Sequence, residues 1–366
     1  MFIKIPENGV IHKVTILGLG HTIGDEAGFK KVTQSDFIRD IISDEARKAL
    51  FGHKPPFSSE EIDEAAKKWE EKTGVGDRLF FHNETWKMGY YAALMCLNQA
   101  GVKVTDLDAI FTGTNTPGDK GYPSPADKIL KALEDLDGHK SNAFCMNVQE
   151  ACTTSAHAIF VAYGLIRAGL CKKILVILPE NCNLLTKPDK WKEGANLFGA
   201  GAGAILLSVS DDVESFLFFD ITADGSKDNL TAIHSDKNND YDFSQRGPDV
   251  LKYVAGAMPK ALMRCFSDAG INPENVSCLI AHQPSGRLMY TFKDNIKNRW
   301  PEFKGIIPEE TGVGNISSAS TIVLFSKLVR SGVIKAGDII SLAPFGAGLS
   351  GACVGIVVPE FNNLKS

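Results

Sequence analysis

The chain lacks the features that mark several classes of protein. It has 39 basic residues against 44 acidic ones in 366 residues, and no basic run is long enough to follow a phosphate backbone. Nucleic acid is therefore not an expected partner. The eight cysteines are sparse, and no pair has the close C-x-x-C spacing of a zinc or redox site. We expect reduced thiols, no metal and a cytoplasmic location.

Export signals and membrane spans are also not expected. The first residues, "MFIKIPENGV", contain Lys4 and no long apolar run. Residues 339–358 are uncharged over the length of a membrane span, but they contain Pro344 and four glycines. We therefore expect a strand, a turn and a second strand in a buried sheet, and no membrane partner.

An internal repeat is the main clue to the fold. Residues 91–113 resemble 260–282 at an offset of 169, and residues 152–169 resemble 315–332 at an offset of 163. Each copy reads as a helix, a strand, a variable connection, a second helix and another strand. This alternation predicts mostly parallel sheets covered by helices, and the two copies predict two packed halves around a pseudo-dyad.

We place the halves at residues 1–210 and 211–366, and the repeat brings candidate residues together between them. Cys152 corresponds to Asn315, each at the start of an apolar helix, and His282 ends a buried strand. If the two helices face each other, the three side chains meet in one cavity.

Cysteine, histidine and asparagine suit thioester chemistry. A helix N-terminus favours a thiolate, so we expect a lowered pKa for Cys152, and a thiolate readily forms an acyl thioester. The imidazole of His282 and the amide of Asn315 can stabilise a negative oxygen. Taken singly, each has a structural explanation, as a buried thiol, a core histidine or an N-cap. Only their related places in the repeat favour the chemical interpretation.

The same residues resemble the thiolase-fold condensing enzymes, specifically the beta-ketoacyl-ACP synthase III branch. The resemblance runs from about Thr15 to Val358. It rests on the order and spacing of "TGVGDR" (73–78), "EAC" (150–152), "FGAGAGA" (198–204), "ADGS" (223–226), "HQPSGR" (282–287), "GNISSAS" (314–320) and "PFGAGLSG" (344–351). It implies a five-layered αβαβα fold. The substrates would ride on coenzyme A or an acyl carrier protein, and no other cofactor is implied.

The resemblance also implies roles for individual residues. Cys152 would take up the acyl group, while His282 and Asn315 would bind the second thioester and stabilise its carbanion. The oxyanion hole would consist of the backbone N–H groups of Cys152 and Ala347. Similar proteins are homodimers, in which the position of Tyr122 closes the partner's acyl pocket.

Phe198 and Arg287 match positions that line the approach to the site and the pantetheine tunnel. Departures from the usual pattern point to specialised metabolism. Residues 25–72 form a charged, helical insertion, with a helix start at Ser58 or Ser59.

The insertion resembles that of ketosynthase/cyclases that make cyclohexanediones for dialkylresorcinols and stilbenes. In that setting Glu150, two residues before Cys152, would be the base for a second, ring-closing bond. The alternative for Glu150 is an acid at a helix entry. Alternatives for the whole chain are a Cys-His-Asn hydrolase, an acyltransferase on the same fold, and a non-catalytic partner subunit.

Overall fold

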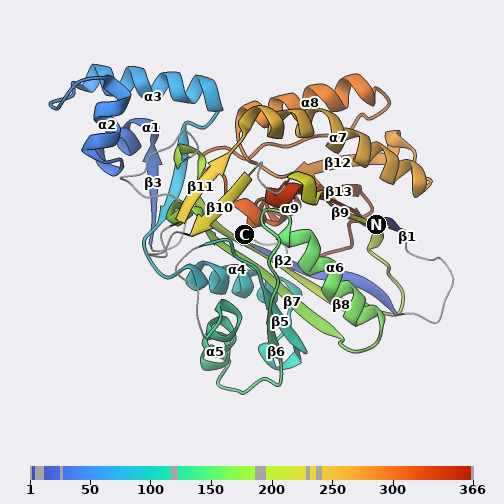
Figure 1. Ribbon diagram of the computed structural model, residues 1–366. Coiled ribbons are helices and arrows are strands. Elements are labelled where there is room, and N and C mark those ends of the chain that lie inside the picture. The colour runs from blue at the N-terminus through green and yellow to red at the C-terminus, as the bar shows by residue number, and fades with distance from the viewer. Residues whose placement is uncertain are drawn as a thin grey trace.

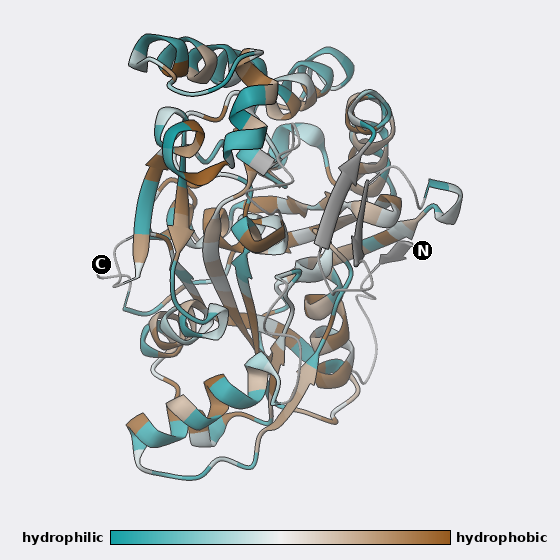
Figure 2. Ribbon diagram, turned by 60° about the vertical axis from the view of Figure 1, so that its left-hand side comes forward, coloured by the Kyte–Doolittle hydropathy of each residue, from teal (hydrophilic) through white to brown (hydrophobic). Residues whose placement is uncertain are grey.

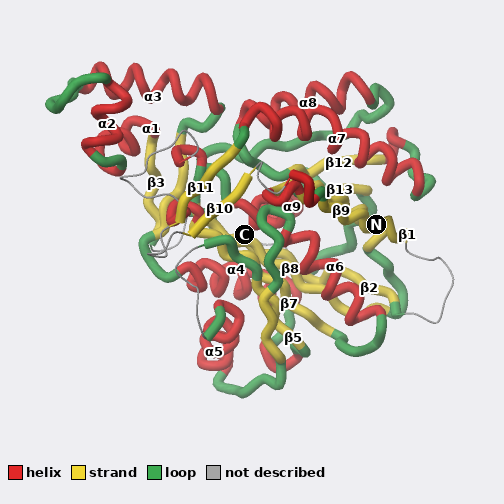
Figure 3. Tube along the Cα trace, viewed as in Figure 1, coloured by secondary structure: helices red, strands yellow, loops and turns green. Residues whose placement is uncertain are grey.

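The computed structural model describes residues 2–4, 12–24, 28–116, 123–185, 195–227, 231–235 and 241–363. Two large β-sheets lie at its centre, with helices between them and on their outer faces (Figure 1). This arrangement confirms the expected αβαβα layers. Figure 3 shows most of the strands near the centre of the molecule and helices around them.

The first sheet has the strand order β2-β8-β7-β5-β6. Its strands are β2 (Lys13–Thr22), β5 (Ala109–Thr112), β6 (Phe144–Asn147), β7 (Lys173–Asn181) and β8 (Ala200–Ser210). β5 is parallel to β6 and β7, whereas β8 is antiparallel to both β2 and β7. Helices cover both faces, which is why β5 and β7 read as almost continuous apolar runs.

The second sheet has the order β1-β9-β15-β13-β12, with β14 paired to β15. Its strands are β1 (Phe2–Lys4), β9 (Phe216–Ala223), β12 (Val276–Ala281), β13 (Ile339–Ala343), β14 (Phe345–Gly346) and β15 (Ser350–Val357). Within this described sheet only β12 and β13 are parallel, so the expectation of mostly parallel sheets is wrong. The chain returns from β13 to β15 through a few residues, too few for the crossover helix that a parallel pair needs.

Three layers of helices complete the fold. α6 (Thr154–Arg167) and α9 (Ser320–Arg330) pack between the sheets in one apolar cluster. α4 (Thr85–Ala100) and α5 (Pro125–Asp137) cover the outer face of the first sheet, and α7 (Gly247–Asp268) and α8 (Gly286–Arg299) cover the second. Figure 2 shows brown strands at the centre and teal on the outer helices, as expected for helices with one buried face.

The structure confirms the repeat element by element. α4 and β5 correspond to α7 and β12, and α6 and β7 correspond to α9 and β13. Gly101 directly follows α4, and Gly270 lies two residues after the end of α7; both have positive φ. The predicted boundary at residue 210 falls between β8 and β9, although β1 joins the second sheet. Residues 339–358 form β13, a turn, β14 and β15, as expected. No helix among the described residues is long and apolar enough to cross a membrane.

The described part of the insertion forms a helical lobe with its own small core. It contains α1 (Gln34–Asp36), a π-helical turn η1 (Phe37–Ile41), α2 (Asp44–Phe51) and α3 (Ser59–Thr73). Ser58 is the N-cap of α3 and forms a capping box with Glu61, which decides between the two expected starts. An antiparallel pair of strands, β3 (Phe29–Thr33) and β4 (Asp77–Phe81), joins the lobe to the body. A separate antiparallel pair, β10 (Thr231–Ser235) with β11 (Tyr241–Gln245), precedes α7.

Candidate active site

Cys152, His282 and Asn315 line one small pocket of about 60 Å³. Cys152 lies two residues before α6, His282 directly follows β12, and Asn315 precedes the short helix η8 (Ser317–Ala319). The rest of the lining is almost entirely apolar or glycine: Leu197, Phe198, Val250, Pro284, Leu288, Phe345, Gly346, Ala347 and Leu349. The three predicted residues therefore converge where the two halves of the molecule meet.

Strained backbone turns fix the positions of Cys152 and of the segment after Asn315. Ala151 and Ser317 both have a φ of 45°, in the left-handed region that non-glycine residues seldom occupy. Gly314, the repeat counterpart of Ala151, also has a positive φ of 81°. Each copy thus reverses the chain directly before its site residue. Such strain persists only where the surrounding packing fixes it, and it is concentrated at functional sites.

Burial dominates the chemistry of the Cys152 thiol. The pKa of this thiol is raised to about 11, chiefly by burial and in part by the charge of Glu180. The hydroxyl of Ser317 opposes this by donating to Cys152 Sγ at 3.3 Å, and so do the backbone N–H groups of Ala347 and Cys152. The expectation of a lowered pKa is therefore wrong. Cys152 precedes the first turn of α6, and loss of solvation outweighs the helix dipole there.

His282 is buried and neutral. Burial lowers the pKa of its imidazole to about 3. Its Nδ1 lies 2.9 Å from Ser320 Oγ, and the Ser320 hydroxyl donates to the carbonyl oxygen of Ser317 at 2.9 Å. A hydroxyl that gives its one proton to a carbonyl accepts from Nδ1–H, which leaves Nε2 of His282 with a free lone pair. Rotation of the Ser320 hydroxyl toward Nδ1 would give the other tautomer.

Asn315 is fixed with its amide N–H groups available. Its Oδ1 accepts from the backbone N–H of Ser317 at 2.8 Å, so the carbonyl end of the side chain is occupied. Its backbone N–H donates to Leu197, and its carbonyl accepts from Gly199. Gly199 has to be a glycine, because a Cβ there would lie 1.8 Å from the carbonyl oxygen of Val313.

The late glycine turn brings a second backbone amide to the sulfur. Ala347 begins the short helix η9 (Ala347–Leu349), directly after Gly346 of β14. A Cβ on Gly346 would lie 2.8 Å from the backbone nitrogen of Cys152. This close approach is what places the Ala347 N–H beside Cys152 Sγ, where both N–H groups of the expected oxyanion hole favour negative charge.

Glu180 is a buried carboxylate that the sequence analysis missed. It lies at the end of β7, is 0% exposed, and accepts hydrogen bonds from the loop 114–116 and from both the backbone and the hydroxyl of Ser318. Burial raises its pKa despite these donors. The only signal in the sequence is an acid at the end of an apolar strand, "KKILVILPEN".

The remaining predicted residues have different positions. Phe198 is buried in the pocket wall. Arg287 is exposed in the first turn of α8, beside the lining residue Leu288. Glu150 is partly exposed; its backbone is held by Thr153 and Thr154, and it is not among the residues that line the pocket. Tyr122 lies outside the described residues.

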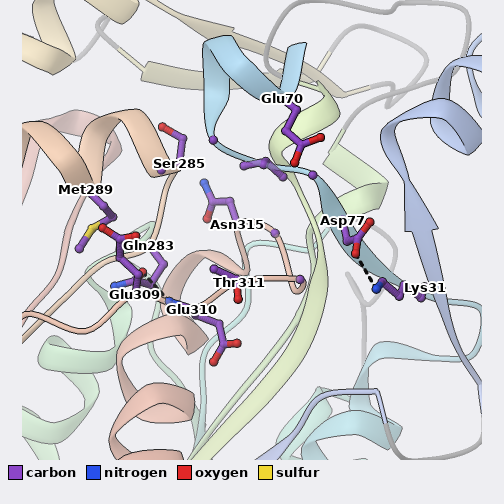
Figure 4. Close-up of a pocket in the computed structure, with 16 residues that line it drawn as sticks. Lys31, Glu70, Asp77, Gln283, Ser285, Met289, Glu309, Glu310, Thr311 and Asn315 are labelled. Carbon is purple, nitrogen blue, oxygen red and sulfur yellow. Dashed lines mark hydrogen bonds and ion pairs between the residues drawn. The ribbon is translucent and has the colours of Figure 1, made fainter. Parts of the chain in front are cut away.

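A larger polar cavity of about 420 Å³ adjoins the first one and shares Asn315 with it (Figure 4). It lies between the end of the lobe, the start of α8 and residues 309–315. Four carboxylates and one lysine line it: Glu70, Asp77, Glu309, Glu310 and Lys31. Asp77 pairs with Lys31 at 2.5 Å, Glu309 with Lys293 at 2.7 Å and Glu310 with Lys327 at 2.6 Å. Three of the four carboxylates are therefore ion-paired, and the lining offers no excess positive charge for a phosphate or carboxylate ligand.

Comparisons with known proteins agree with this geometry. Residues 146–225 match the family model for 3-oxoacyl-[acyl-carrier-protein (ACP)] synthase III, and residues 266–357 match the model for its C-terminal part. The beta-ketoacyl-[acyl-carrier-protein] synthase III of Aquifex aeolicus is 28% identical over 302 residues, 81% of this chain and 93% of that protein. A synthase III of Halalkalibacterium halodurans is 27% identical over 337 residues, 91% of this chain and 95% of that protein.

A solved structure has the same fold. The priming beta-ketosynthase from the R1128 polyketide biosynthetic pathway superposes with a TM-score of 0.78. It is 22% identical in sequence, and the match covers 97% of this chain and 99% of that one. The similarity therefore extends over both halves of the molecule.

Proposed function

Because the chain belongs to the 3-oxoacyl-[acyl-carrier-protein] synthase III family of thiolase-fold condensing enzymes, we propose that it acylates Cys152 and joins this acyl group to a second thioester. The convergence of Cys152, His282 and Asn315 in one apolar pocket carries this proposal. A thiol supplies the nucleophile, and a neutral imidazole and an amide supply hydrogen bonds without adding a charge.

In the first half-reaction the thiol of Cys152 attacks an acyl thioester. With a thiol pKa of about 11 and an imidazole pKa of about 3, the resting pair is uncharged. The proton therefore leaves the sulfur as the S–C bond forms, and Nε2 of His282 accepts it. The N–H groups of Cys152 and Ala347 stabilise the tetrahedral oxyanion. The carrier thiolate leaves and takes the proton back.

In the second half-reaction a second thioester occupies the pocket. The amide of Asn315 and the N–H tautomer of His282 donate to its carbonyl oxygen, which stabilises the enolate form of its carbanion. The carbanion, formed when the α-carbon loses CO2 or a proton, attacks the acyl carbonyl on Cys152. A C–C bond forms, the S–C bond to Cys152 breaks, and the Cys152 thiolate leaves and takes up a proton. The product is a 3-oxoacyl thioester.

The carrier arm enters through the apolar pocket. The adjoining polar cavity is lined by four carboxylates and one lysine, whereas Arg287 offers an exposed positive charge beside the apolar pocket. Coenzyme A and the phosphopantetheine of an acyl carrier protein both bring phosphate to the mouth of such a site. We assign Arg287 to that phosphate.

A homodimer is part of the proposal. β6 is one of the two edge strands of the first sheet, and Phe144 in it is 48% exposed. An edge strand with an exposed aromatic residue is suited to pairing with another strand. A second copy added along β6 would continue the sheet across the two protomers.

A subsequent ring closure is a second candidate function, with Glu150 as the base. It is supported by the proximity of Glu150 to Cys152 in sequence and by its partial exposure. Glu150→Gln should then yield the linear condensation product in place of the cyclic one. Unchanged cyclic product from this variant would eliminate Glu150 as the base.

The main experiment offers a panel of acyl, 3-oxoacyl and malonyl thioesters and follows both protein and products by mass spectrometry. Wild type should gain an acyl group and form a C–C product. Cys152→Ala should not acylate, whereas His282→Ala should acylate more slowly and remain acylated without condensing. Rapid release of free acid without a second substrate would instead indicate a hydrolase, and acyl transfer to a hydroxyl or amine would indicate an acyltransferase.

A further inference from the structure

Ser317 lies between the sulfur of Cys152 and the side chain of Asn115. Its hydroxyl is 3.3 Å from Cys152 Sγ and 2.9 Å from Asn115 Nδ2. An amide nitrogen does not accept hydrogen bonds, so the serine proton cannot point toward Asn115. Its single proton is thereby left for the sulfur, and the hydroxyl is oriented as a donor before any substrate arrives.

Glu180 fixes which end of the Asn115 amide faces Ser317. Asn115 Nδ2 lies 2.9 Å from Glu180 Oε1 and 3.0 Å from the carbonyl oxygen of Ala151, both of which can only accept, so its two N–H groups are shared among these two oxygens and Ser317 Oγ. The backbone N–H of Asn115 donates to Glu180 Oε2 at 2.9 Å. Ser318, next to Ser317, also donates to Glu180. The loops that carry Asn115 and Ser317 are thus fastened to the same buried carboxylate.

We propose that Ser317 is a catalytic hydrogen-bond donor to the Cys152 sulfur and that Asn115, held by Glu180, is its positioning residue. The proposal rests on the proposed function only in taking Cys152 as the acylated nucleophile. The backbone N–H of Ser317 also donates to Asn315 Oδ1. One strained residue therefore positions Asn315 and contacts the Cys152 sulfur.

The hydroxyl would act whenever the sulfur carries negative charge. During acylation the S–H bond breaks, the proton passes to His282, and charge develops on sulfur as the S–C bond forms. During condensation the S–C bond breaks, and the sulfur leaves as a thiolate that then takes up a proton. A hydrogen bond to a charged group stabilises it more than one to a neutral group, so Ser317 lowers both barriers.

Alkylation of Cys152 by iodoacetamide tests the donor without an acyl substrate. The rate is measured at pH 8.5 by peptide mass spectrometry for wild type, Ser317→Ala and Ser317→Gly. Both variants lack the hydroxyl, but glycine also relieves the positive φ. A lost hydrogen bond to a thiolate raises its pKa by about one to two units, and a more basic thiolate is also more nucleophilic, so we expect about 3- to 10-fold slower alkylation in both.

The matched control is Ser341→Ala in β13, a buried serine whose hydroxyl donates to the carbonyl of Leu342. Its alkylation rate should equal that of wild type. Ser317→Gly at the wild-type rate with Ser317→Ala slowed would assign the effect to the backbone and overturn the donor role. Wild-type rates in both variants would overturn it as well.

The double variant tests the positioning role. Asn115→Ala should slow alkylation less than Ser317→Ala does, because the freed hydroxyl still reaches the sulfur in part of the population. Combined with Ser317→Ala it should add nothing, since Asn115 acts through Ser317. Additive effects would overturn this positioning role. Slower alkylation together with no condensation product from any thioester would leave the donor role standing and reject the proposed function.

Discussion

Gly199 offers a way to move Asn315 without touching Cys152. A Cβ at this position would lie 1.8 Å from the carbonyl oxygen of Val313, 2.9 Å from its carbonyl carbon and 3.3 Å from Gly314 Cα. Since real Cβ contacts are essentially never below 3.0 Å, Gly199→Ala has to push segment 313–315 by about 1.2 Å. A misplacement of about 1 Å in a catalytic group can cost about 100-fold in rate.

We therefore expect Gly199→Ala to acylate Cys152 near the wild-type rate and to condense about 100-fold more slowly. Acylation is followed by intact-protein mass spectrometry and condensation by product mass, after the melting temperature has shown that the variant is folded. Gly164→Ala is the control, because a Cβ on this exposed helical glycine of α6 has nothing within 4 Å. Wild-type condensation by Gly199→Ala would refute the role of the Asn315 position.

Three further predictions concern the thiol, the glycine turn and the lobe. Because burial raises the pKa of Cys152 to about 11, its alkylation rate should rise about tenfold per pH unit from pH 7 to 10. Cys152→Ser is the blank. A plateau of the rate near pH 8 would show that the pKa is lowered, as the sequence predicted. Gly346→Ala should slow acylation, measured by intact mass, because its Cβ would lie 2.8 Å from the Cys152 nitrogen. Unimpaired acylation would show that the backbone of the turn moves to accommodate the Cβ. Ser58→Ala should lower the stability of the lobe, measured by the hydrogen-exchange protection of its amides, by about 1 kcal/mol. Ser59→Ala, which does not remove the cap, should leave this protection unchanged. Equal protection in both variants would rule out the stabilising role of the cap.

Much of the architecture was predictable because its signals are local or repeat at a fixed offset. Glycine after a helix, Ser58 before the charged helix, and proline with glycines in residues 339–358 each act within a few positions. The repeat added the one long-range inference, since equivalent elements in two copies occupy equivalent places. It brought Cys152, Asn315 and His282 together correctly.

Strand direction was not predictable in the same way. Alternating helices and strands favour parallel sheets, but β15 returns beside β13 through a connection that is too short for a crossover. The direction of β15 relative to β13 depends on how the connecting segment runs in space, and the order of helices and strands along the chain does not determine it.

The sequence by itself determined the fold class, the pairing of the two halves and the residues that meet between them. The tertiary structure alone decided the electrostatics of that meeting place. The pKa of Cys152 depends on how much water the two halves exclude, on buried Glu180, and on a serine 165 positions away. Solvation and hydrogen bonds of this kind arise only after packing, because they depend on groups that no local pattern relates to the cysteine.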